Sequence, residues 1–342
     1  MNASYPLGKL PPEHLARIFE RYPPSDERVV LGPGIGHDAA VLSFCERDSS
    51  LDTYLVAKTD PITFASEEIG WYAVHVNAND VACTGATPRW FLATLLLPQE
   101  STDQALVDEI FDQIAQTCDQ LNIALVGGHT EITHGFDRPV IAGFMLGEVA
   151  QDAFVRPDGA RPGDILLLTK GVAVEGTAII AREKGDDLQQ VDAALVERSR
   201  DFLHRPGISV VRDAAIAVKA GDVHAMHDPT EGGLATGLWE LAEAAQVGLT
   251  VNEAAIPVFE ETAALCEALD LDPLGLIASG ALLLAVAPGD ANDVCTALEE
   301  SGITTARIGR VVARDEGRKL HSPGRERPLP RFERDEIARL FE

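Results

Sequence analysis

The stretch from Val56 to Pro88 constrains the fold of this chain most, because it joins a strand pattern to a helix pattern through a charged segment. The β-type run at 54–57 is expected to stop at Lys58-Thr59-Asp60. A helix is expected from about Glu68 to Thr84, and its later turns carry four polar side chains: His75, Asn77, Asn79 and Asp80. Such groups among small residues indicate a place where the backbone approaches a ligand. We interpret the ligand as a nucleoside triphosphate with its divalent metal.

The length of the chain, 342 residues, is sufficient for two domains of ordinary size, each with its own core. No apolar run reaches the 18 residues or so that a membrane span requires. The first residues lack the charged and then apolar order of a secretory signal. We therefore expect a globular protein of the cytoplasm.

The charge balance is strongly acidic, with 54 Asp and Glu against 28 Lys and Arg and a formal net charge of -26. Such a surface repels nucleic acid and anionic membranes, so neither is expected as a partner. A polyanion can still bind where a metal ion and backbone N–H groups neutralise the site. A solvated surface adapted to high salt explains the acidity better than a functional acidic patch.

The five cysteines are scattered and odd in number, and no two of them form a C-x-x-C pair. This pattern argues against a disulfide framework and against a zinc site. We expect most of them to be small core residues.

Apolar strand-like runs alternate with helix-like segments along the whole chain, which predicts an α/β or α+β fold. The Pro- and Gly-containing stretch 155–171 marks a domain boundary, giving expected domains 1–154 and 155–342. The tail 316–330, a polar stretch with three Arg and three Pro, is expected to be irregular. Helices are expected at 12–21, 102–121, 173–183, 195–203, 209–220, 257–269 and 291–301, with a further amphipathic helix after the glycine pair in 227–248.

Polar clusters lie where these runs give way to loops or helices, at 36–38, 58–60, 77–80, 127–131 and 228–233. Carboxylate oxygens suit Mg²⁺, and glycine pairs at helix starts let N–H groups approach phosphates. Each cluster alone has an ordinary alternative. A lone Asp after glycines is commonly a turn residue, Asp228-x-x-Glu231 can be a capping box, and His75 can be a packed core histidine. The run 171–177 has P-loop spacing without the lysine.

Taken in order, the motifs resemble the aminoimidazole ribonucleotide synthetase-related (PurM-like) superfamily. They are D-A-A-V at 38–41, T-D at 59–60, I-G-x-x-A-V-x-x-x-x-N-D-V-A-x-x-G-A-x-P at 69–88, G-G-x-T at 127–130, P-G-D at 162–164 and D-x-T-x-G-G-L-A at 228–235. The resemblance covers about residues 28–315, and the block at 69–88 looks most like the HypE-like proteins. It implies an N-terminal α/β domain whose strands form a barrel across a homodimer, a C-terminal α/β domain, and ATP bound between them.

The resemblance also implies roles for individual positions. Asp38, Asp60 and Asp80 match the acidic metal positions of the superfamily. The nucleotide-binding positions are matched by Asn79, Gly127, Gly128, Thr130, Asp228, Gly232 and Gly233.

Several departures from the superfamily patterns limit the expected chemistry. HypE ends in a Pro-Arg-x-Cys tail whose cysteine carries the carbamoyl group, whereas no cysteine follows Cys295 here, so that chemistry on its own tail is not expected. Selenophosphate synthetases have a reactive residue before the glycine turn, and none precedes Cys45 here. Thiamine-monophosphate kinases have Asp where this chain has His37 and His129. The purine synthetase pattern S-T-D-G-V-G-T-K is absent.

Two hypotheses follow. The first is an ATP- and Mg²⁺-dependent enzyme that activates a small substrate by phosphoryl transfer, chemistry that needs positioning and charge neutralisation. In it Lys58 neutralises phosphate, and His129 and Glu131 are candidate catalytic groups for proton transfer or substrate binding. The second is a non-catalytic ATP-binding homodimer that serves as a scaffold or maturation partner in metallocofactor assembly.

Overall fold

The computed structural model describes residues 12–21, 23–24, 26–43, 52–63, 67–322 and 324–340. The chain divides into two compact units. The N-terminal unit comprises 28–31 and 38–154, and the C-terminal unit comprises 155–342 with residues 32–37 and the described part of 1–27. The predicted domains 1–154 and 155–342 stay a prediction, because the units assign the segments before residue 28 and at 32–37 to the C-terminal unit.

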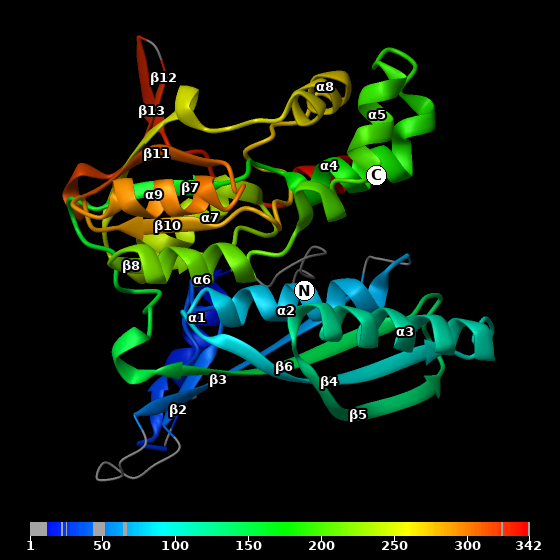
Figure 1. Cartoon of the computed structure of the whole chain (residues 1–342). Helices are drawn as coiled ribbons and strands as arrows, with labels where there is room; N and C mark the ends of the chain where they lie inside the picture. Colours follow the sequence, from blue (N-terminus) through cyan, green and yellow to red (C-terminus); the bar gives the residue numbers. More distant parts are fainter. Residues whose placement is uncertain are drawn as a thin grey trace, which may run out of the picture. The chain divides into compact units, whose positions relative to one another are not determined.

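The N-terminal unit is built on a six-stranded sheet in the order β1-β2-β3-β6-β4-β5 (Figure 1). Only β4 and β5 are parallel neighbours, and every other adjacent pair is antiparallel. The strands are β1 (Val29–Leu31), β2 (Ala40–Ser43), β3 (Thr53–Ile62), β4 (Thr87–Pro98), β5 (Ala124–Thr133) and β6 (Val140–Ala150).

Two helices, α2 (Ile69–Ala82) and α3 (Gln104–Leu121), lie on the same side of this sheet (Figure 1). Nearly every residue of α2 is buried, because the helix packs against β3 and β6 on one side and against α3 on another. Gly70 permits the close approach of the two helices, since a Cβ there would lie 2.6 Å from the carbonyl oxygen of Ile110. The apolar repeat of α3 buries Ile110, Ile114 and Cys118 as its spacing predicts.

Two strands are longer than the sequence pattern predicts. β3 continues through Lys58-Thr59-Asp60 to Ile62, and β5 continues through 127–131 to Thr133. Both extensions are held by backbone pairing with a neighbouring strand, β6 for β3 and β4 for β5. Such pairing does not depend on apolar side chains, so a polar group need not end a strand.

The C-terminal unit is built on a seven-stranded sheet in the order β13-β12-β9-β11-β7-β10-β8. Residues Leu166, Leu167 and Leu168 of β7 and all of β10 are buried, as expected for strands covered on both faces. The strands are β7 (Ile165–Thr169), β8 (Val223–His227), β9 (Gly248–Asn252), β10 (Leu283–Val286), β11 (Thr305–Val312), β12 (Arg318–Ser322) and β13 (Arg325–Pro328).

The helices of this unit follow the predicted alternation with strands. They are α1 (Pro12–Arg21), α4 (Val174–Lys184), α5 (Ala193–Arg200), α6 (Val211–Ala220), α7 (Gly233–Ala244), α8 (Glu260–Leu269) and α9 (Ala291–Glu300). The predicted irregular tail 316–330 is wrong, since it contains the hairpin β12–β13, and β9 was not predicted. β12 pairs with the apolar strand β9, which supplies the apolar contact that the charged hairpin sequence lacks.

The mixed α/β prediction is confirmed by these two sheets and their helices. Among the helices of the described residues, none combines the length and the apolarity that a membrane span requires. Cys83, Cys118 and Cys266 are buried, as expected for small core residues, while Cys295 is half-buried and Cys45 lies outside the described residues.

Candidate functional site

The central feature of the N-terminal unit is a mostly buried lysine held between carboxylates. Lys58 and Asp60 point to the same face of β3, because side chains alternate along a strand. The Lys58 Nζ atom lies 3.2 Å from Asp60 Oδ2 and 2.9 Å from Asp80 Oδ2, which comes from the last turns of α2. Asp80 is buried, and about a third of the Asp60 side chain is exposed. We call Lys58 with Asp38, Asp60 and Asp80 the lysine cluster.

The electrostatics of the lysine cluster favour a permanently charged lysine. Burial by itself lowers the pKa of Lys58, and the carboxylates of Asp80, Asp60 and Asp38 outweigh it, so that the pKa is raised above its ordinary value. Three carboxylates against one ammonium leave two negative charges. A set of carboxylate oxygens with excess negative charge fits a hard cation such as Mg²⁺.

An amide and a hydroxyl hydrogen-bond the backbone around this cluster. Asn77 Nδ2 donates to the backbone oxygens of Asp60, at 3.2 Å, and of Ala73, at 2.8 Å. The Thr59 hydroxyl donates to Gly143 O at 2.8 Å. Asn79, predicted as the amide beside the metal, is fully buried. Asn77 therefore ties α2 to β3, a role that no pattern in the sequence assigned to it.

The predicted phosphate loop 127–131 is part of β5, an exposed strand at the edge of the described sheet, where its neighbour is β4. Gly128 has a φ of 148°, and a Cβ there would clash with the backbone of Ala93, so glycine is required. His129 Nε2 lies 3.7 Å from Glu131 Oε2, and both side chains are mostly exposed. Beside them is a cavity of about 250 Å³ between β5 and α3, lined by Phe111, Ile114 and residues 127–130 among others.

The strand register gives the separation between the lysine cluster and residues 127–131 of β5. Asp60 is paired with Gly143, Gly143 with Ala93, and Ala93 with Gly128, so all four residues share one level of the sheet. Three strand spacings separate Asp60 from Gly128, about 14 Å in all. One metal ion, with ligands at about 2–2.6 Å, cannot join them.

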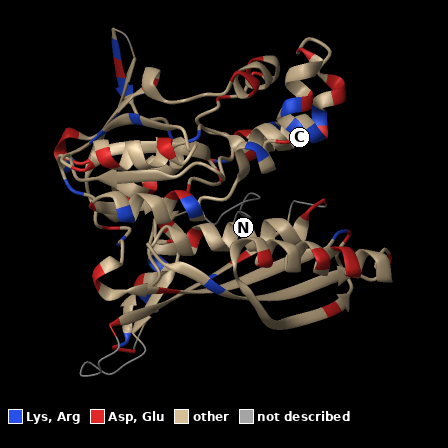
Figure 2. Ribbon diagram, viewed as in Figure 1, with Lys and Arg blue, Asp and Glu red and all other residues tan. Residues whose placement is uncertain are grey.

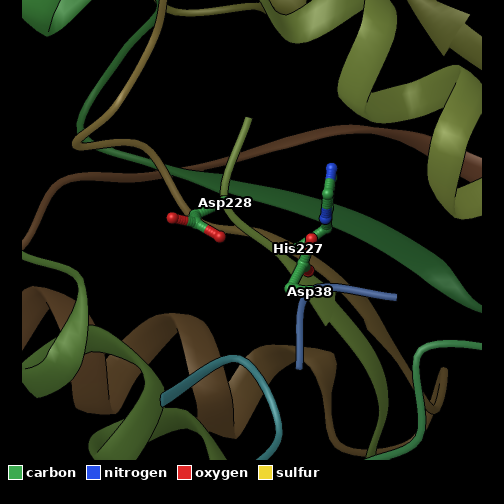
Figure 3. Close-up of side chains that lie close together, drawn as sticks. All are labelled: Asp38, His227 and Asp228. Atoms are coloured by element: carbon green, nitrogen blue, oxygen red, sulfur yellow. The ribbon is translucent and has the colours of Figure 1, made fainter. Parts of the chain in front are cut away.

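The predicted residues of the C-terminal unit surround the start of α7. His227, drawn with Asp228 in Figure 3, ends β8, and its Nε2 atom lies 2.9 Å from Glu240 Oε2. Helix α7 has Gly232 as its N-cap, so the capping box at Asp228-x-x-Glu231 is wrong. The Gly232 N–H donates to Asp335 Oδ2 at 2.6 Å. One of the two predicted phosphate donors therefore already has a carboxylate acceptor.

Sequence reasoning missed two acids with raised pKa values in the C-terminal unit, the buried Glu175 and the half-buried Asp335. Glu175 is buried in the first turn of α4, and its Oε2 atom accepts no hydrogen bond from any described residue. Burial raises the pKa of Glu175 to about 7; a Ser279 hydrogen bond opposes this, and Glu231 and Asp335 add to it. Burial likewise raises the pKa of Asp335 to about 6, despite N–H donors from Ile337, Gly232 and Ile277. We call Glu175, Glu231 and Asp335 the acid cluster.

A glutamate in the otherwise apolar run 172–178 was the only signal for the acid cluster. Residues 171–177 were considered only for their P-loop spacing, which lacks the lysine, and the glutamate was assigned no role. Its partners lie 56 and 160 positions further along the chain, so spacing could not associate them. Strongly shifted acids of this kind are candidates for functional residues.

Comparison with known proteins identifies the family. Residues 36–149 match the N-terminal domain of AIR synthase related proteins, and residues 161–321 match the C-terminal domain. Carbamoyl dehydratase HypE of Rhizobium leguminosarum bv. viciae is 31% identical over 268 residues, which cover 77% of this chain and 73% of that protein. The chain belongs to the AIR synthase-related family, among its HypE-like proteins.

Other HypE proteins support the same assignment. The HypE-like chain is 34% identical to carbamoyl dehydratase HypE of Azotobacter vinelandii, over 74% of its own length and 72% of that protein. Its fold matches a crystal structure of the hydrogenase maturation protein HypE in complex with ATP, with a TM-score of 0.72 and 28% identity. That match covers 90% of this chain and 92% of the other. The predicted two-domain PurM-like fold is confirmed.

Proposed function

We propose that this HypE-like chain is an ATP- and Mg²⁺-dependent enzyme that activates an oxygen atom of a small acid, amide or phosphate by phosphoryl transfer. The substrate oxygen forms a bond to the γ-phosphorus while the bond from that phosphorus to the bridging oxygen breaks, and ADP leaves with the electron pair. The lysine cluster carries the proposal, because its two excess negative charges suit a divalent cation and its lysine suits a phosphate. The ATP complex of the related HypE structure supports it.

Each predicted site residue has a place in this proposal. Asp38, Asp60 and Asp80 would hold Mg²⁺, which when bound neutralises phosphate charge. Lys58 would balance further phosphate charge, since its ammonium is fixed between Asp60 and Asp80. The remaining nucleotide contacts would come from Asn79, Gly127, Gly128, Thr130, Asp228, Gly232 and Gly233.

Proton transfer is assigned to the pair on β5. The 3.7 Å separation of His129 and Glu131 lets the carboxylate orient the imidazole for proton transfer. Strand alternation places both side chains on the face of the sheet opposite to Asp60, so the imidazole would take a proton from a substrate oxygen that reaches that face. Both groups are exposed to water in the single chain. Efficient proton transfer by this pair therefore requires that another protein surface pack against β5 and exclude water.

The cover we propose is a second copy of the chain, in a homodimer whose strands form a barrel. Along the free edge of β5, Leu125, Val126 and Ile132 are 39%, 53% and 58% exposed. An exposed apolar edge strand is a template for pairing with another chain. Val126→Lys should convert the dimer to monomer in size-exclusion chromatography with light scattering. Val258→Lys, at an exposed valine of the C-terminal unit, should leave the mass unchanged.

ATP hydrolysis with Mg²⁺, in the presence of a panel of small acids and amides, tests the enzyme proposal. Asp80→Asn keeps the shape of the side chain and removes one charge, and we expect turnover to fall about 100-fold, as for loss of one transition-state contact. Asp137→Asn is the matched control, because Asp137 is exposed and, among the described residues, its one ion pair is with its neighbour Arg138. Equal rates for wild type and Asp80→Asn, or no turnover by either, would count against the proposal.

A second candidate is an ATP-binding maturation partner without turnover, in hydrogenase-type metallocofactor assembly. The name hydrogenase maturation protein HypE, carried by the related structure, favours its role in maturation, whereas the name carbamoyl dehydratase, carried by the sequence relatives, is that of an enzyme. ATP binding by calorimetry without product formation would favour this candidate over the enzyme. Activity with thiamine monophosphate would instead indicate a kinase of the same family, although His37 and His129 replace the acids expected there.

A further inference from the structure

The C-terminal unit contains a cavity of about 350 Å³ whose walls carry three arginines and a tryptophan. Trp239 comes from α7, Arg314 from the short helix η5 (Arg314–Glu316) and Arg318 from β12, while Arg331 follows β13. Val247 and Leu329 form an apolar part of the lining. Three arginines around one cavity are unusual in a chain whose acids outnumber its bases by 54 to 28. Figure 2 shows Lys and Arg on the adjoining hairpin β12–β13.

We propose that this arginine–tryptophan pocket binds a small organic oxyanion, a phosphate or carboxylate attached to a planar ring. The volume lies at the small end of the range of about 300–1,000 Å³ for ligand pockets. Arginine forms paired, charge-assisted hydrogen bonds with phosphate and carboxylate oxygens. The apolar side chains of Val247 and Leu329 offer the ring a surface on which to lie.

Two of the arginines are held in fixed positions before any ligand arrives. The Cζ atoms of Arg331 and Arg318 lie 4.6 and 5.4 Å from the centroid of the Trp239 ring, within cation–π range. Arg331 Nη2 donates a hydrogen bond to Glu13 Oε1 at 2.8 Å, and Arg318 Nη2 donates one to Glu243 Oε2 at 2.5 Å. The guanidinium groups are therefore oriented in advance, which lowers the entropy cost of binding an anion.

The third arginine supplies the charge that remains for a ligand. Among the residues that the structure describes, Arg314 makes no ion pair, although its field acts on Glu243. Arg318 and its neighbours hold the pKa of Glu243 below its usual range, so this carboxylate stays ionised. With Glu13 and Glu243 offsetting Arg331 and Arg318, one positive charge is left in the pocket. The ligand should therefore carry a single strongly anionic group.

Phenyl phosphate is the probe, because it combines one phosphate with one planar ring, and its binding to the full chain is measured by isothermal titration calorimetry. Arg314→Ala should weaken binding by about tenfold or more, the usual effect of losing one charge-assisted hydrogen bond. Arg314 is exposed and unpaired in the described chain, so this change should not alter folding. Arg310→Ala, at an exposed arginine outside the cavity, is the matched control and should bind like wild type.

Three further ligands test separately the anionic group, the ring and the independence from the nucleotide site. Benzoate should bind the same pocket and lose affinity in Arg314→Ala, whereas inorganic phosphate, without a ring, should bind more weakly than phenyl phosphate. Saturating ATP should leave phenyl phosphate binding unchanged, which separates this pocket from the proposed nucleotide site. If phenyl phosphate does not bind to wild type, or binds equally to wild type and Arg314→Ala, the proposal that this pocket binds an organic oxyanion is refuted. Equally tight binding of inorganic phosphate and phenyl phosphate would refute the claim that the pocket recognises a planar ring.

Discussion

The lysine cluster and the acid cluster both bury carboxylates, but only one of them includes a cation. In the lysine cluster, an ammonium lies 3.2 and 2.9 Å from two carboxylate oxygens. In the acid cluster, Glu175 and Asp335 have backbone and hydroxyl donors, and Glu175 keeps one oxygen without a partner among the described residues. Each cluster has one buried carboxylate and two that are half-buried, so the difference between the clusters is the presence of a charge partner.

This difference determines how each cluster responds to pH. The raised pKa of Lys58 keeps its ammonium charged well above neutral pH, so the lysine cluster retains its cation across the physiological range. The pKa values of Glu175 and Asp335, about 7 and about 6, place the titration of the acid cluster near neutrality. One cluster is thus suited to hold a cation permanently, and the other to exchange protons.

Removing the cation from the lysine cluster should have the largest effect. Lys58→Met leaves buried Asp80 and half-buried Asp60 without their partner, and we expect a loss of about 3 kcal/mol in the free energy of unfolding. Urea denaturation measures it. Millimolar Mg²⁺ should restore more stability to this variant than to wild type, because a ligand of the native state stabilises it. Lys219→Met, at an exposed lysine, is the control. Unchanged stability of Lys58→Met without Mg²⁺ would contradict the role of the lysine.

The acid cluster should respond to pH where the lysine cluster does not. Because the folded-state pKa of Glu175 is raised from 4.5 to about 7, the folded protein binds the proton more tightly than the unfolded chain. Stability from this group is therefore present below pH 4.5 and is lost as the pH rises to about 7. Glu175→Gln should remove that loss. Relative to wild type, the free energy of unfolding of this variant should rise by on the order of 2–3 kcal/mol as the pH increases from 5 to 8. A difference that stays constant across this range would refute the shifted titration.

The two clusters also differ in how far they could be predicted from the sequence. Lys58, Asp60 and Asp80 lie within 23 consecutive positions on one strand and the next helix, so their motifs mark them as a group. Glu175, Glu231 and Asp335 are spread over three distant segments, and no local pattern relates them. Their proximity arises only when α4, the start of α7 and the C-terminal segment pack together.

The fold shows the same division between local and tertiary information. The helices α1, α2 and α3 were predicted to within about two residues at each end, because apolar spacing and capping residues are local signals. The hairpin β12–β13 was missed because its residues are charged and its partner, β9, lies about 70 positions earlier. The polar ends of β3 and β5 were missed for the related reason that backbone pairing keeps them in the sheet.

The smallest expected effect comes from a single hydrogen bond of the acid cluster, between Ser279 and Glu175. Ser279 is buried and its hydroxyl favours the ionised form of Glu175. Ser279→Ala should therefore raise the pKa of Glu175 further and cost about 1 kcal/mol at pH 8, where the carboxylate is charged. At pH 5, where the acid is neutral in the folded state, the cost should be smaller.

A double-mutant cycle measured by urea denaturation checks this expectation. In the Glu175→Gln background, Ser279→Ala should have the same effect at pH 5 and pH 8, since no carboxylate remains to ionise. A pH-dependent effect of Ser279→Ala that persists in that background would assign the dependence to another group, with Glu231 and Asp335 as the nearest acids. The acid cluster would then be a site of shared titration, whereas the lysine cluster has a charge fixed by one residue.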